Sequence, residues 1–421
     1  MLTKAPRGTG DILPGEVERW QYLEEEFRKL CRDYNYKEIR TPIFEHTELF
    51  VRSVGEDTDI VGKEMYTFLD KGDRSITLRP EGTAPTVRAY LQHKLYGQAQ
   101  PVKLFYHGPM FRYDRPQAGR YRQFHQWGVE VFGSEEPLLD AEVISLAVAF
   151  FNSVGIEGLV LELNSVGCSE CRSSYREEIR NYMANYRNSL CPDCNRRFET
   201  NPLRILDCKE KSCKELTIEI PEMTGHLCDN CRKHFSQVVN GLEAIGVTYR
   251  INPRLVRGLD YYTRTAFEII DPQLGSQNSL GGGGRYDDLV EVCGGNPTPA
   301  VGFAIGMERV LLALKNKIIE PSYQEESGVF VAALGDKADI EGLKVVTELR
   351  RQKIKAEKDY LKRSLKAQMK QANKINTRYV VIMGEEELEK DKVLLRDMQE
   401  GHQWEVARMD ITACLKEKMG R

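Results

Sequence analysis

The sequence predicts an α+β protein in which an antiparallel sheet with flanking helices is followed by a separate C-terminal α/β domain. Strand-like segments recur up to residue 165 and again after residue 245, and loops rather than regular helices join most of them. The chain between them is charged, cysteine-rich and helical in pattern, which indicates an insertion into a discontinuous domain. Beyond residue 327, strands and helices alternate as in a compact α/β unit.

The individual elements follow from the spacing of apolar residues. Steps of three and four residues predict a helix over residues 15–33, and an apolar stretch predicts a second one over 138–153. The C-terminal unit should contain helices over 336–351 and 361–375 together with four strands. Alternating patterns predict further strands over residues 39–44, 75–80, 102–113, 124–133 and 159–165.

Three domains are therefore expected. A discontinuous domain covers residues 1–165 and 246–320, the helical insertion covers 166–245, and the C-terminal domain covers 327–421. The segment 316–327 is polar and carries a proline, which is typical of a linker.

Composition excludes several classes of protein. Apolar residues make up 41% of the 421 residues, and the best apolar run, Val143–Phe151, is half of the ~18 residues that a membrane span needs. The N-terminus has no apolar segment of the kind that secretory signals carry. The eleven cysteines are odd in number and eight of them cluster between Cys168 and Cys231, which favours reduced thiols or a metal site over disulfides. We therefore expect a cytoplasmic protein.

The segment FRYDRPQAGRYRQFHQWGVE (111–130) has four arginines within eleven residues, with aromatic residues between them. Pro116 and Gly119 predict a turn between two strands, so that some of these arginines converge on one face. Guanidinium groups bind phosphate oxygens bidentately and aromatic rings stack on purines, which fits a nucleoside triphosphate or RNA phosphate site. A solvated hairpin with cross-strand Arg–Glu pairs is the alternative.

Three later segments also have unusual composition. LVRGLDYYTRTAFEI (255–269) places Arg257 near a pair of tyrosines, and LGGGGRYDDLV (280–290) has four consecutive glycines. Because such a run costs backbone entropy, we expect the backbone to approach a ligand there, with a flexible hairpin tip as the alternative. PAVGFAIGMERVLLAL (299–314) predicts a small-residue strand and a helix, for which tight packing is the alternative.

Together these segments resemble the signature motifs of the class II aminoacyl-tRNA synthetases, and most closely those of the histidyl-tRNA synthetase family. IRTPIF is similar to motif 1 at the dimer interface, FRYDRPQAGRYRQF to motif 2 and GFAIGMERV to motif 3. LVRGLDYYTRTAFE and LGGGGRYD match the histidine-specific signatures, and TLRPEGTAP (77–85) matches the amino-acid-binding loop. One departure is Asp114, where motif 2 usually has glutamate. The resemblance implies a catalytic first domain and an anticodon-binding C-terminal domain.

The resemblance implies a two-step reaction. The histidine carboxylate attacks the ATP α-phosphate to give histidyl-adenylate and pyrophosphate, and the terminal ribose hydroxyl of histidine tRNA then takes the histidyl group. Arg112 would bind the α-phosphate, Arg309 the γ-phosphate, and Arg257 would be the distinctive catalytic arginine, with Mg²⁺ accompanying ATP. Phe124 would stack on adenine. The remaining ATP-binding residues would be Asp114, Arg120 and Gln126.

Histidine selection, by the same resemblance, depends on Glu130 and Tyr261, which would read the two imidazole nitrogens. A pocket built on such buried polar pairs rejects apolar analogues. The other histidine-binding residues would be Glu81, Thr83 and Gln126 around the amino group, Tyr262 and Tyr286 closing the pocket, and Gly82.

The net charge of −3 does not by itself indicate a polyanionic partner, but its distribution does. Between Arg350 and Arg378 there are eleven Lys and Arg against two Asp and Glu, a local +9 that leaves −12 for the rest of the chain. This stretch lies in the domain that the family uses to read the anticodon, where phosphate contacts add affinity. We expect a homodimer without a membrane partner. The residues assigned to tRNA are Arg115, Gln117, Lys362, Arg363, Lys366 and Lys370.

Two Cys-x2-Cys pairs, at 168–171 and 191–194, have the spacing of a four-cysteine zinc site. A helix of about eighteen residues between them would span roughly 27 Å, which argues against that pairing. If this helix packs antiparallel to the one that starts near the pair at 228–231, its end would meet that start. Reduced thiols packed as small hydrophobic groups are the alternative. The predicted structural zinc ligands are Cys191, Cys194, Cys228 and Cys231, with Cys208 and Cys213 as alternates.

Two other functions stay open. A synthetase-like regulatory subunit of histidine biosynthesis would bind without aminoacylation activity, but it typically lacks both the intact LVRGLDYY signature and the C-terminal domain. A zinc-ribbon RNA-binding protein would explain the cysteines and the basic stretches but not the ordered pocket residues.

Overall fold

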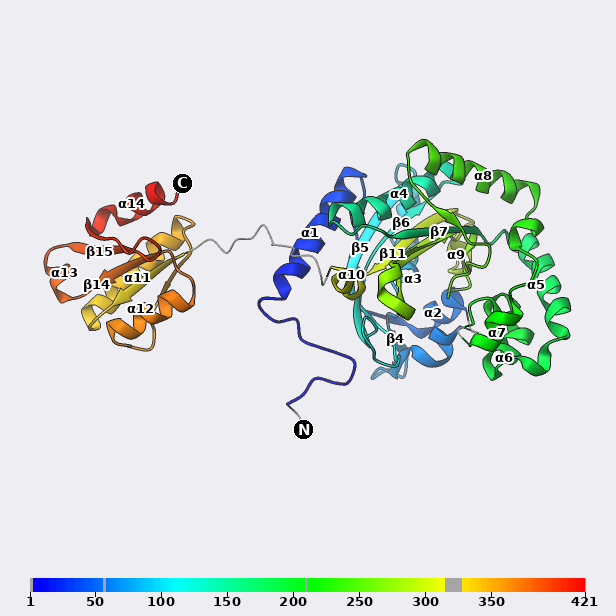
Figure 1. Ribbon diagram of the computed structural model, residues 1–421, viewed down its shortest axis with the longest axis horizontal. Helices are drawn as coiled ribbons and strands as arrows, with labels where there is room; N and C mark the ends of the chain where they lie inside the picture. The colour runs from blue at the N-terminus through cyan, green and yellow to red at the C-terminus, as the bar shows by residue number, and fades with distance from the viewer. Residues whose placement is uncertain (1–2, 56–57, 209, 315–327, 421) are drawn as a thin grey trace. The chain divides into compact units, whose positions relative to one another are not determined.

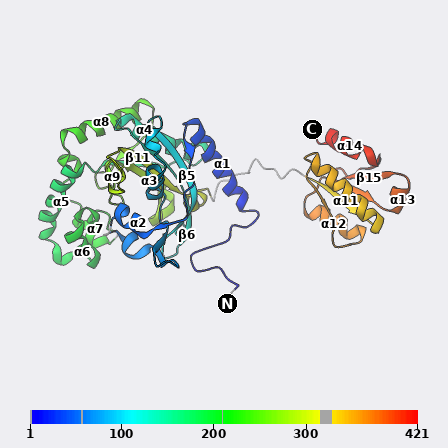
Figure 2. The same cartoon turned by 180° about the vertical axis from the view of Figure 1, so that it is seen from behind.

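The computed structural model describes residues 3–55, 58–208, 210–314 and 328–420. The chain divides into two compact units, residues 1–319 and 320–421 (Figures 1 and 2). The predicted linker, 316–327, lies outside the described residues.

The first unit is built on an eight-stranded sheet of order β1-β5-β6-β11-β10-β9-β7-β8. The six inner strands pair antiparallel, and the two-residue edge strands β1 and β8 pair parallel with their neighbours. In the long pair of β5 and β6, Phe111 lies opposite Gln123, so the arginine-rich residues 112–122 form the loop between them, as predicted. The strands are β1 (Lys37–Glu38), β5 (Val102–Phe111), β6 (Gln123–Phe132), β7 (Val160–Ser165), β8 (Arg250–Ile251), β9 (Thr263–Ile270), β10 (Ser279–Arg285) and β11 (Ala300–Gly306).

Helices α1 (Val17–Asp33), α4 (Pro137–Ser153) and α8 (Asp229–Ala244) share one hydrophobic core with the sheet. Phe27 of α1 stacks on Trp127 of β6 with ring centres 5.2 Å apart, which confirms the predicted first helix and its buried stripe. Because side chains alternate along a strand, the even-numbered residues of β6 face the opposite side of the sheet. On that side Phe132 stacks on Tyr90 of α3 (Thr83–Gln92).

A second, three-stranded sheet shows where the prediction for residues 39–44 is wrong. The large sheet ends at Glu38 of β1, whereas the small sheet begins at Phe44. Pro42 lies between them, and because it has no backbone N–H it cannot continue a ladder on both sides. The small sheet contains β2 (Phe44–His46), β3 (Tyr66–Leu69) and β4 (Ser75–Leu78).

Between β7 and β8 the chain forms helices, which lie together at one side of the first unit in Figures 1 and 2. They enclose a core of their own, to which eight cysteines contribute as buried or partly buried members. These helices are α5 (Ser169–Ala184), α6 (Pro192–Thr200), α7 (Lys211–Leu216) and α8.

The second unit is a five-stranded sheet of order β13-β12-β14-β15-β16 with helices packed on it. The predicted helix over 361–375 begins later, at Leu365, because Lys362 has a positive φ of 50° and Asp359 accepts the backbone N–H of Arg363. Its strands are β12 (Val329–Ala333), β13 (Ala356–Lys358), β14 (Tyr379–Met383), β15 (Lys392–Asp397) and β16 (Gln403–Ala407). Its longer helices are α11 (Asp336–Arg351), α12 (Leu365–Lys374) and α14 (Ile411–Lys418).

Candidate active site

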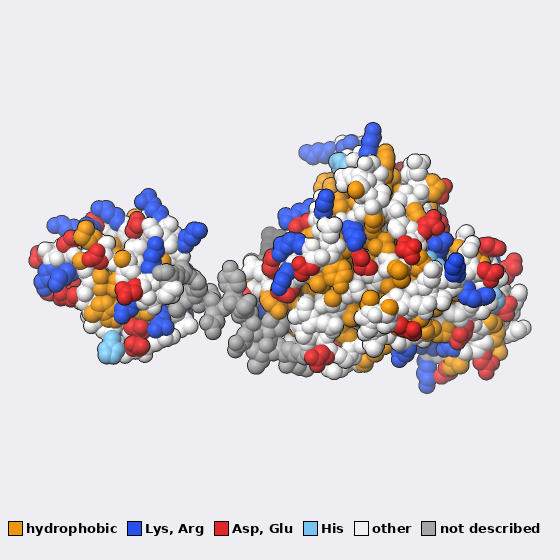
Figure 3. All heavy atoms as spheres, turned by 90° about the horizontal axis from the view of Figure 1, so that it is seen from above, with side chains coloured by type: hydrophobic (Ala, Val, Ile, Leu, Met, Phe, Trp, Pro, Cys, Tyr) orange, Lys and Arg blue, Asp and Glu red, His pale blue; other side chains and the backbone are white. Residues whose placement is uncertain are grey.

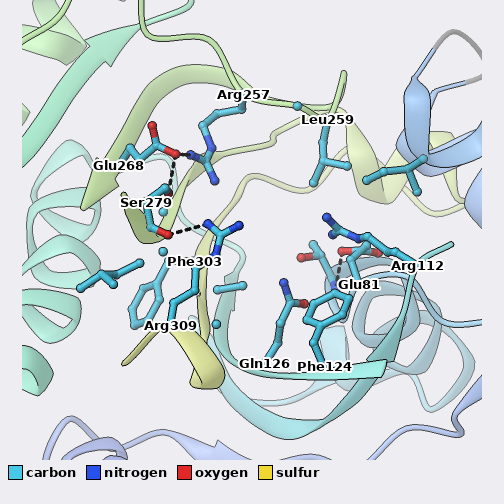
Figure 4. Close-up of a pocket in the computed structure, with 18 of the residues that line it drawn as sticks. Glu81, Arg112, Phe124, Gln126, Arg257, Leu259, Glu268, Ser279, Phe303 and Arg309 are labelled. Atoms are coloured by element: carbon cyan, nitrogen blue, oxygen red, sulfur yellow. Dashed lines mark hydrogen bonds and ion pairs between the residues drawn. The ribbon is translucent and has the colours of Figure 1, made fainter. Parts of the chain in front are cut away.

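A cavity of about 410 Å³ lies in the first unit, lined by strands β5, β6, β9, β10 and β11, the arginine-rich loop 112–122 and the segment 256–262. Strands that precede the helices between β7 and β8 and strands that follow them therefore meet in it. Figure 4 shows two groups of side chains facing each other across the cavity: Arg257, Glu268, Ser279 and Arg309 on one side, and Glu81, Arg112, Phe124 and Gln126 on the other.

Arg257 is held in place by a carboxylate of β9. Its Nη1 donates to Glu268 Oε1 at 2.9 Å, and the Ser279 hydroxyl donates to the same oxygen at 2.6 Å (Figure 4). The Nε of Arg257 is buried and has no hydrogen-bond partner among the described residues. The guanidinium is thus fixed on one side while an N–H group stays available to a ligand.

Arg309 lies in the first turn of α10 (Met307–Ala313) and joins the arginine-rich loop to β10. Its Nη1 donates to the Ser279 carbonyl at 2.6 Å, and its Nε donates to the Gly119 carbonyl at 3.2 Å. Burial lowers the pKa of Arg309, and the nearby charges of Arg120 and Arg112 lower it further. The charges of Arg112, Arg120 and Arg309 therefore act on one another within the cavity, and an anion bound among them would relieve their repulsion.

The loop between β5 and β6 arranges the other charged groups. Arg112 Nε donates to the Pro80 carbonyl at 2.8 Å, and its Cζ lies 5.3 Å from the centre of the Phe124 ring. Asp114, the residue that departs from the family pattern, is ion-paired with Arg120. The shorter carboxylate therefore pairs with an arginine of its own loop.

Two buried carboxylates joined by Thr83 also line the cavity, and one of them, Glu81, lies on the same side as Arg112 (Figure 4). The Thr83 hydroxyl donates to Glu130 at 2.7 Å, and the Thr83 N–H donates to Glu81 at 2.7 Å. Glu81 also accepts the N–H of Ala84 at 2.8 Å, so it caps the first turn of α3, and Glu130 also accepts from the Tyr286 hydroxyl. Burial raises the pKa of Glu81, and it raises the pKa of Glu130 to about 8 despite these hydrogen bonds.

Gln126 offers an acceptor in the same region. It lies on the same face of β6 as Glu130, and its Oε1 is buried without a hydrogen-bond partner in the part of the chain that the structure describes. Because a buried polar atom without a partner costs free energy, a ligand N–H group is the expected partner. We call the part of the cavity around Glu81, Gln126 and Glu130 the acceptor-rich end and the part around the guanidinium groups the cationic end. Arg112, whose charge interacts with Glu81, lies where the two meet.

Most of the residues assigned to ATP and histidine line this cavity. They are Glu81, Thr83, Arg112, Asp114, Arg120, Phe124, Gln126, Glu130, Arg257, Tyr261, Tyr262, Tyr286 and Arg309. Gly82 is not among the lining residues: a Cβ there would lie 2.2 Å from the Tyr106 ring, so glycine is needed for packing. Arg115 and Gln117 lie in the loop with exposed side chains, and the four residues assigned between 362 and 370 belong to the second unit.

Several polar lining residues did not follow from the sequence. A carboxylate within the apolar strand TRTAFEII is the one signal that points to Glu268. Glu308 accepts the His125 N–H at 2.9 Å, a contact between residues 183 positions apart that no local pattern indicates. Tyr106, Asp207 and Ser279 also line the cavity, and Asp207 comes from the segment between α6 and α7.

The glycine run forms an inner strand, so the alternative of a flexible hairpin tip is wrong. A Cβ on Gly283 would lie 2.0 Å from the Gly302 carbonyl oxygen, and one on Gly284 would lie 2.2 Å from that of Thr265. A Cβ on Gly282 would lie 2.8 Å from Arg257 Nη1. The glycines therefore mainly allow the backbone of β10 to lie close to the neighbouring strands and to an arginine side chain.

The cysteines pair differently from the prediction, so the predicted zinc set of Cys191, Cys194, Cys228 and Cys231 is wrong. The pair at 228–231 starts α8 and lies beside the pair at 168–171, which starts α5, because these helices meet at their N-terminal ends. The segment between α6 and α7 returns to the pair at 191–194. The two resulting groups are Cys168, Cys171, Cys228 and Cys231, and Cys191, Cys194, Cys208 and Cys213.

Comparison with known proteins identifies the family to which the chain belongs. A family model described as histidyl-tRNA synthetase matches residues 8–171 and 218–310, and one described as an anticodon binding domain matches residues 328–418. The chain belongs to the histidyl-tRNA synthetase family. It is 57% identical over 416 residues to the histidine–tRNA ligase of Desulforamulus reducens, which covers 99% of both chains.

Two further relatives extend this finding. The chain is 56% identical to the histidine–tRNA ligase of Pelotomaculum thermopropionicum, covering 100% of this chain and 99% of the relative. It is 42% identical to the crystal structure of apo S. aureus histidyl-tRNA synthetase, with a TM-score of 0.83, covering 98% of this chain and 99% of that chain. The predicted family and fold class are confirmed. None of the described helices is long and apolar enough to cross a membrane.

The raised pKa of Glu130 predicts a pH-dependent stability. The neutral carboxyl is favoured in the folded state, so its contribution to stability is complete below about pH 4.5 and is lost as the pH rises through about 8. Glu130→Gln stays neutral at both pH values. The thermal midpoint of this variant minus that of the wild type should therefore be several degrees higher at pH 9 than at pH 5. Scanning calorimetry at both pH values measures this, with the exposed Glu157→Gln as control. An equal difference at the two pH values would contradict the prediction.

Proposed function

We propose that this protein is a histidine–tRNA ligase that activates L-histidine with ATP and then transfers it to the 3′ end of histidine tRNA. One observation carries the proposal: a single cavity has buried carboxylates and a Gln126 oxygen without a partner among the described residues at one end and four arginines at the other. The first end suits the amino and imidazole groups of histidine, and the second suits a triphosphate.

In the first step the acceptor-rich end holds the amino acid. Glu130 and Tyr261 would contact the imidazole nitrogens, while Glu81, Thr83 and Gln126 would surround the amino group. The remaining polar residues, Tyr262 and Tyr286, would close the pocket around the ring. The carboxylate of histidine then points toward the arginines, where its oxygen attacks the α-phosphorus and the bond to the β-phosphate oxygen breaks.

The cationic end stabilises the charge that develops on the phosphate oxygens. Arg112 and Arg257 would contact the α-phosphate, and Arg309 would hold the γ-phosphate until pyrophosphate leaves. Phe124, beside Arg112, would stack on the adenine ring. Asp114, Arg120 and Gln126 would complete the ATP site.

Magnesium fits this end of the cavity by the chemistry of its donors. The carboxylates of Glu268 and Glu308 line the same cavity as the arginines, and carboxylate oxygens are the ligands that Mg²⁺ prefers. When bound, the ion would offset part of the charge of the triphosphate.

Histidine tRNA would contact both units. The exposed side chains of Arg115 and Gln117 lie in the loop beside the cavity, where the acceptor end must enter. In the second unit, assigned as the anticodon-binding domain over 327–421, basic and acidic side chains are interspersed on the face that Figure 3 shows. The basic residues proposed to contact tRNA there are Lys362, Arg363, Lys366 and Lys370.

The remaining assignments complete the proposal. Residues 1–165 and 246–320 would form the catalytic domain, and 166–245 the insertion. Exposed apolar side chains gather around the small sheet of the first unit and suit a homodimer interface that includes motif 1. They are Ile43, Phe44, Phe68 and Leu69. We propose a cytoplasmic location for the ligase.

Histidine-dependent ATP–pyrophosphate exchange tests the proposed function. Purified protein should catalyse exchange with histidine at least about 10³-fold faster than with other amino acids, because the pocket's buried polar groups would be left unpaired by them. Absence of exchange with every amino acid would favour the regulatory-subunit or RNA-binding alternative. Exchange with a different amino acid would refute the histidine assignment, and charging of histidine tRNA tests the second step.

A further inference from the structure

We propose that the insertion binds two structural zinc ions, one in each group of four cysteines, and that the second ion anchors a segment which supports the loop of Arg257. The first half of this proposal is independent of the ligase activity, whereas the second half rests on it. We call Cys168, Cys171, Cys228 and Cys231 site A, and Cys191, Cys194, Cys208 and Cys213 site B.

The sulfur positions fit a tetrahedral metal site. Four thiolates at about 2.3 Å from a zinc ion lie about 3.8 Å from one another. In site A the Sγ of Cys168 is 3.5 Å from that of Cys171 and 4.0 Å from that of Cys228, and in site B the Sγ atoms of Cys191 and Cys208 are 3.8 Å apart. Disulfide sulfurs would be about 2.0 Å apart, and all of these cysteines are free.

Backbone groups support the sulfurs in both sites. In site A the Cys228 N–H donates to Cys171 Sγ at 3.1 Å. In site B the Cys191 N–H donates to Cys213 Sγ at 3.3 Å, and the Cys194 N–H donates to Cys191 Sγ at 3.4 Å. Such second contacts orient metal ligands and offset the negative charge of four thiolates.

The core of the insertion also indicates a need for metal. Five of its fourteen buried residues are cysteines of sites A and B, so relatively little apolar surface remains to stabilise the helices. Small cores of this kind are commonly supplemented by a structural metal, and sites with four cysteines and no open position are structural rather than catalytic.

Site B lies next to the residues that hold the loop of Arg257 in place. Asn201 and Arg204 belong to the segment between ligands Cys194 and Cys208. Asn201 Nδ2 donates to Asp260 Oδ1 at 3.0 Å, and Arg204 Nη2 donates to the Gly258 carbonyl at 3.2 Å.

The same segment reaches the cavity through Asp207, which directly precedes Cys208. It also lies between the two stretches that the family model matches, within the proposed insertion. A zinc ion in site B would therefore fix the segment against residues 258–260, directly after Arg257.

Metal analysis of the full chain, purified without chelator, tests the two sites. We expect about two zinc ions per chain, and about one in Cys194→Ser and in Cys231→Ser, which each remove a ligand of one site. Cys414→Ser, outside both sites, is the matched control and should keep two. Less than about 0.2 zinc per chain in the wild type, or a single ion, would overturn the proposal.

A second measurement does not depend on whether a cysteine variant folds. Titration of the wild-type protein with a mercurial reagent, which displaces metal from thiolates, should release about two zinc ions per chain into a colorimetric chelator. Release of no zinc would overturn the proposal even if every variant failed to fold.

The supporting role of the segment is tested without touching a ligand. Asn201→Ala should lower kcat of histidine-dependent exchange about tenfold with an unchanged KM for histidine and an unchanged zinc content, because Arg257 would be less well positioned. Asn195→Ala, whose side chain bonds the Leu190 carbonyl within the insertion, is the matched control. A wild-type kcat in Asn201→Ala would refute the supporting role. Absence of exchange in the wild type would instead refute the proposed function and leave the zinc measurement intact.

Discussion

Arg257→Ala is expected to slow histidyl-adenylate formation by about 10³-fold while the affinity for histidine changes little. The side chain lies at the cationic end of the cavity, where Glu268 fixes one edge of the guanidinium and its buried Nε has no partner among the described residues. Charge on the α-phosphate oxygens increases toward the transition state, so a fixed cation there lowers the barrier more than it strengthens binding. Pyrophosphate exchange measures the rate, and calorimetric titration measures histidine affinity.

Two further variants make this result specific. Arg257→Lys keeps the charge but loses the fork of N–H groups, so it should recover only part of the lost rate. Arg254→Ala changes an exposed arginine three residues earlier, which bonds the Ile218 carbonyl outside the cavity, and should stay within about twofold of wild type. Exchange by Arg257→Ala at a near wild-type rate would show that the assigned role is wrong.

Arg285→Met is expected to destabilise the first unit by about 3–5 kcal/mol, which corresponds to a fall of about 10 °C in its thermal midpoint. Arg285 is completely buried and bonds Asp140 at 2.5 Å, Asp287 at 3.1 Å and the Ser134 carbonyl at 2.8 Å. Burial raises the pKa of Asp140, and the guanidinium opposes that effect. Removing the cation leaves the carboxylate buried without its charge partner.

The expected loss of stability is larger than the loss that follows from removing an ordinary exposed ion pair. Arg52→Met removes an exposed arginine that pairs with Glu48 one helical turn away, and should cost less than about 1 kcal/mol. Replacing both Asp140 and Arg285 by apolar residues should cost less than Arg285→Met alone, since the fully buried Asp140 is then removed with its partner, while Asp287 keeps Arg264 at 3.7 Å. Calorimetry of the three proteins checks this, and similar midpoints for Arg285→Met and Arg52→Met would contradict the prediction.

Local patterns predicted most of the elements. The helices α1, α4 and α11 and the strands β5 to β7 lie within two residues of their expected bounds, because spacing of apolar residues reports directly on which face is buried. The strand over 39–44 failed because its two ends belong to different sheets. The periodicity of a segment can be read from that segment alone, whereas the strand with which it pairs cannot.

In the candidate site too, some residues could be predicted from local patterns and others could not. Arg112, Glu130 and Arg257 could be named because they fall in ordered motifs with chemically unusual composition. Glu308 and Asp207 could not, since each reaches the cavity only when distant segments pack together. The resemblance located the arginines, but the structure shows that Glu268 holds Arg257, that the Ser279 hydroxyl donates to Glu268, and that the Ser279 carbonyl accepts from Arg309.

By itself, the sequence determined the fold class, the family and the chemical types of group in the active site, because periodicity and motif order are local properties of the chain. Only the tertiary structure decided how the eight cysteines combine. Their spacing suggested that the end of α5 meets the start of α8, whereas the two helices meet at their starts and produce two groups of four. The physical reason is that ligand groups form through the packing of helices separated by tens of residues, and spacing along the chain does not specify the direction of that packing.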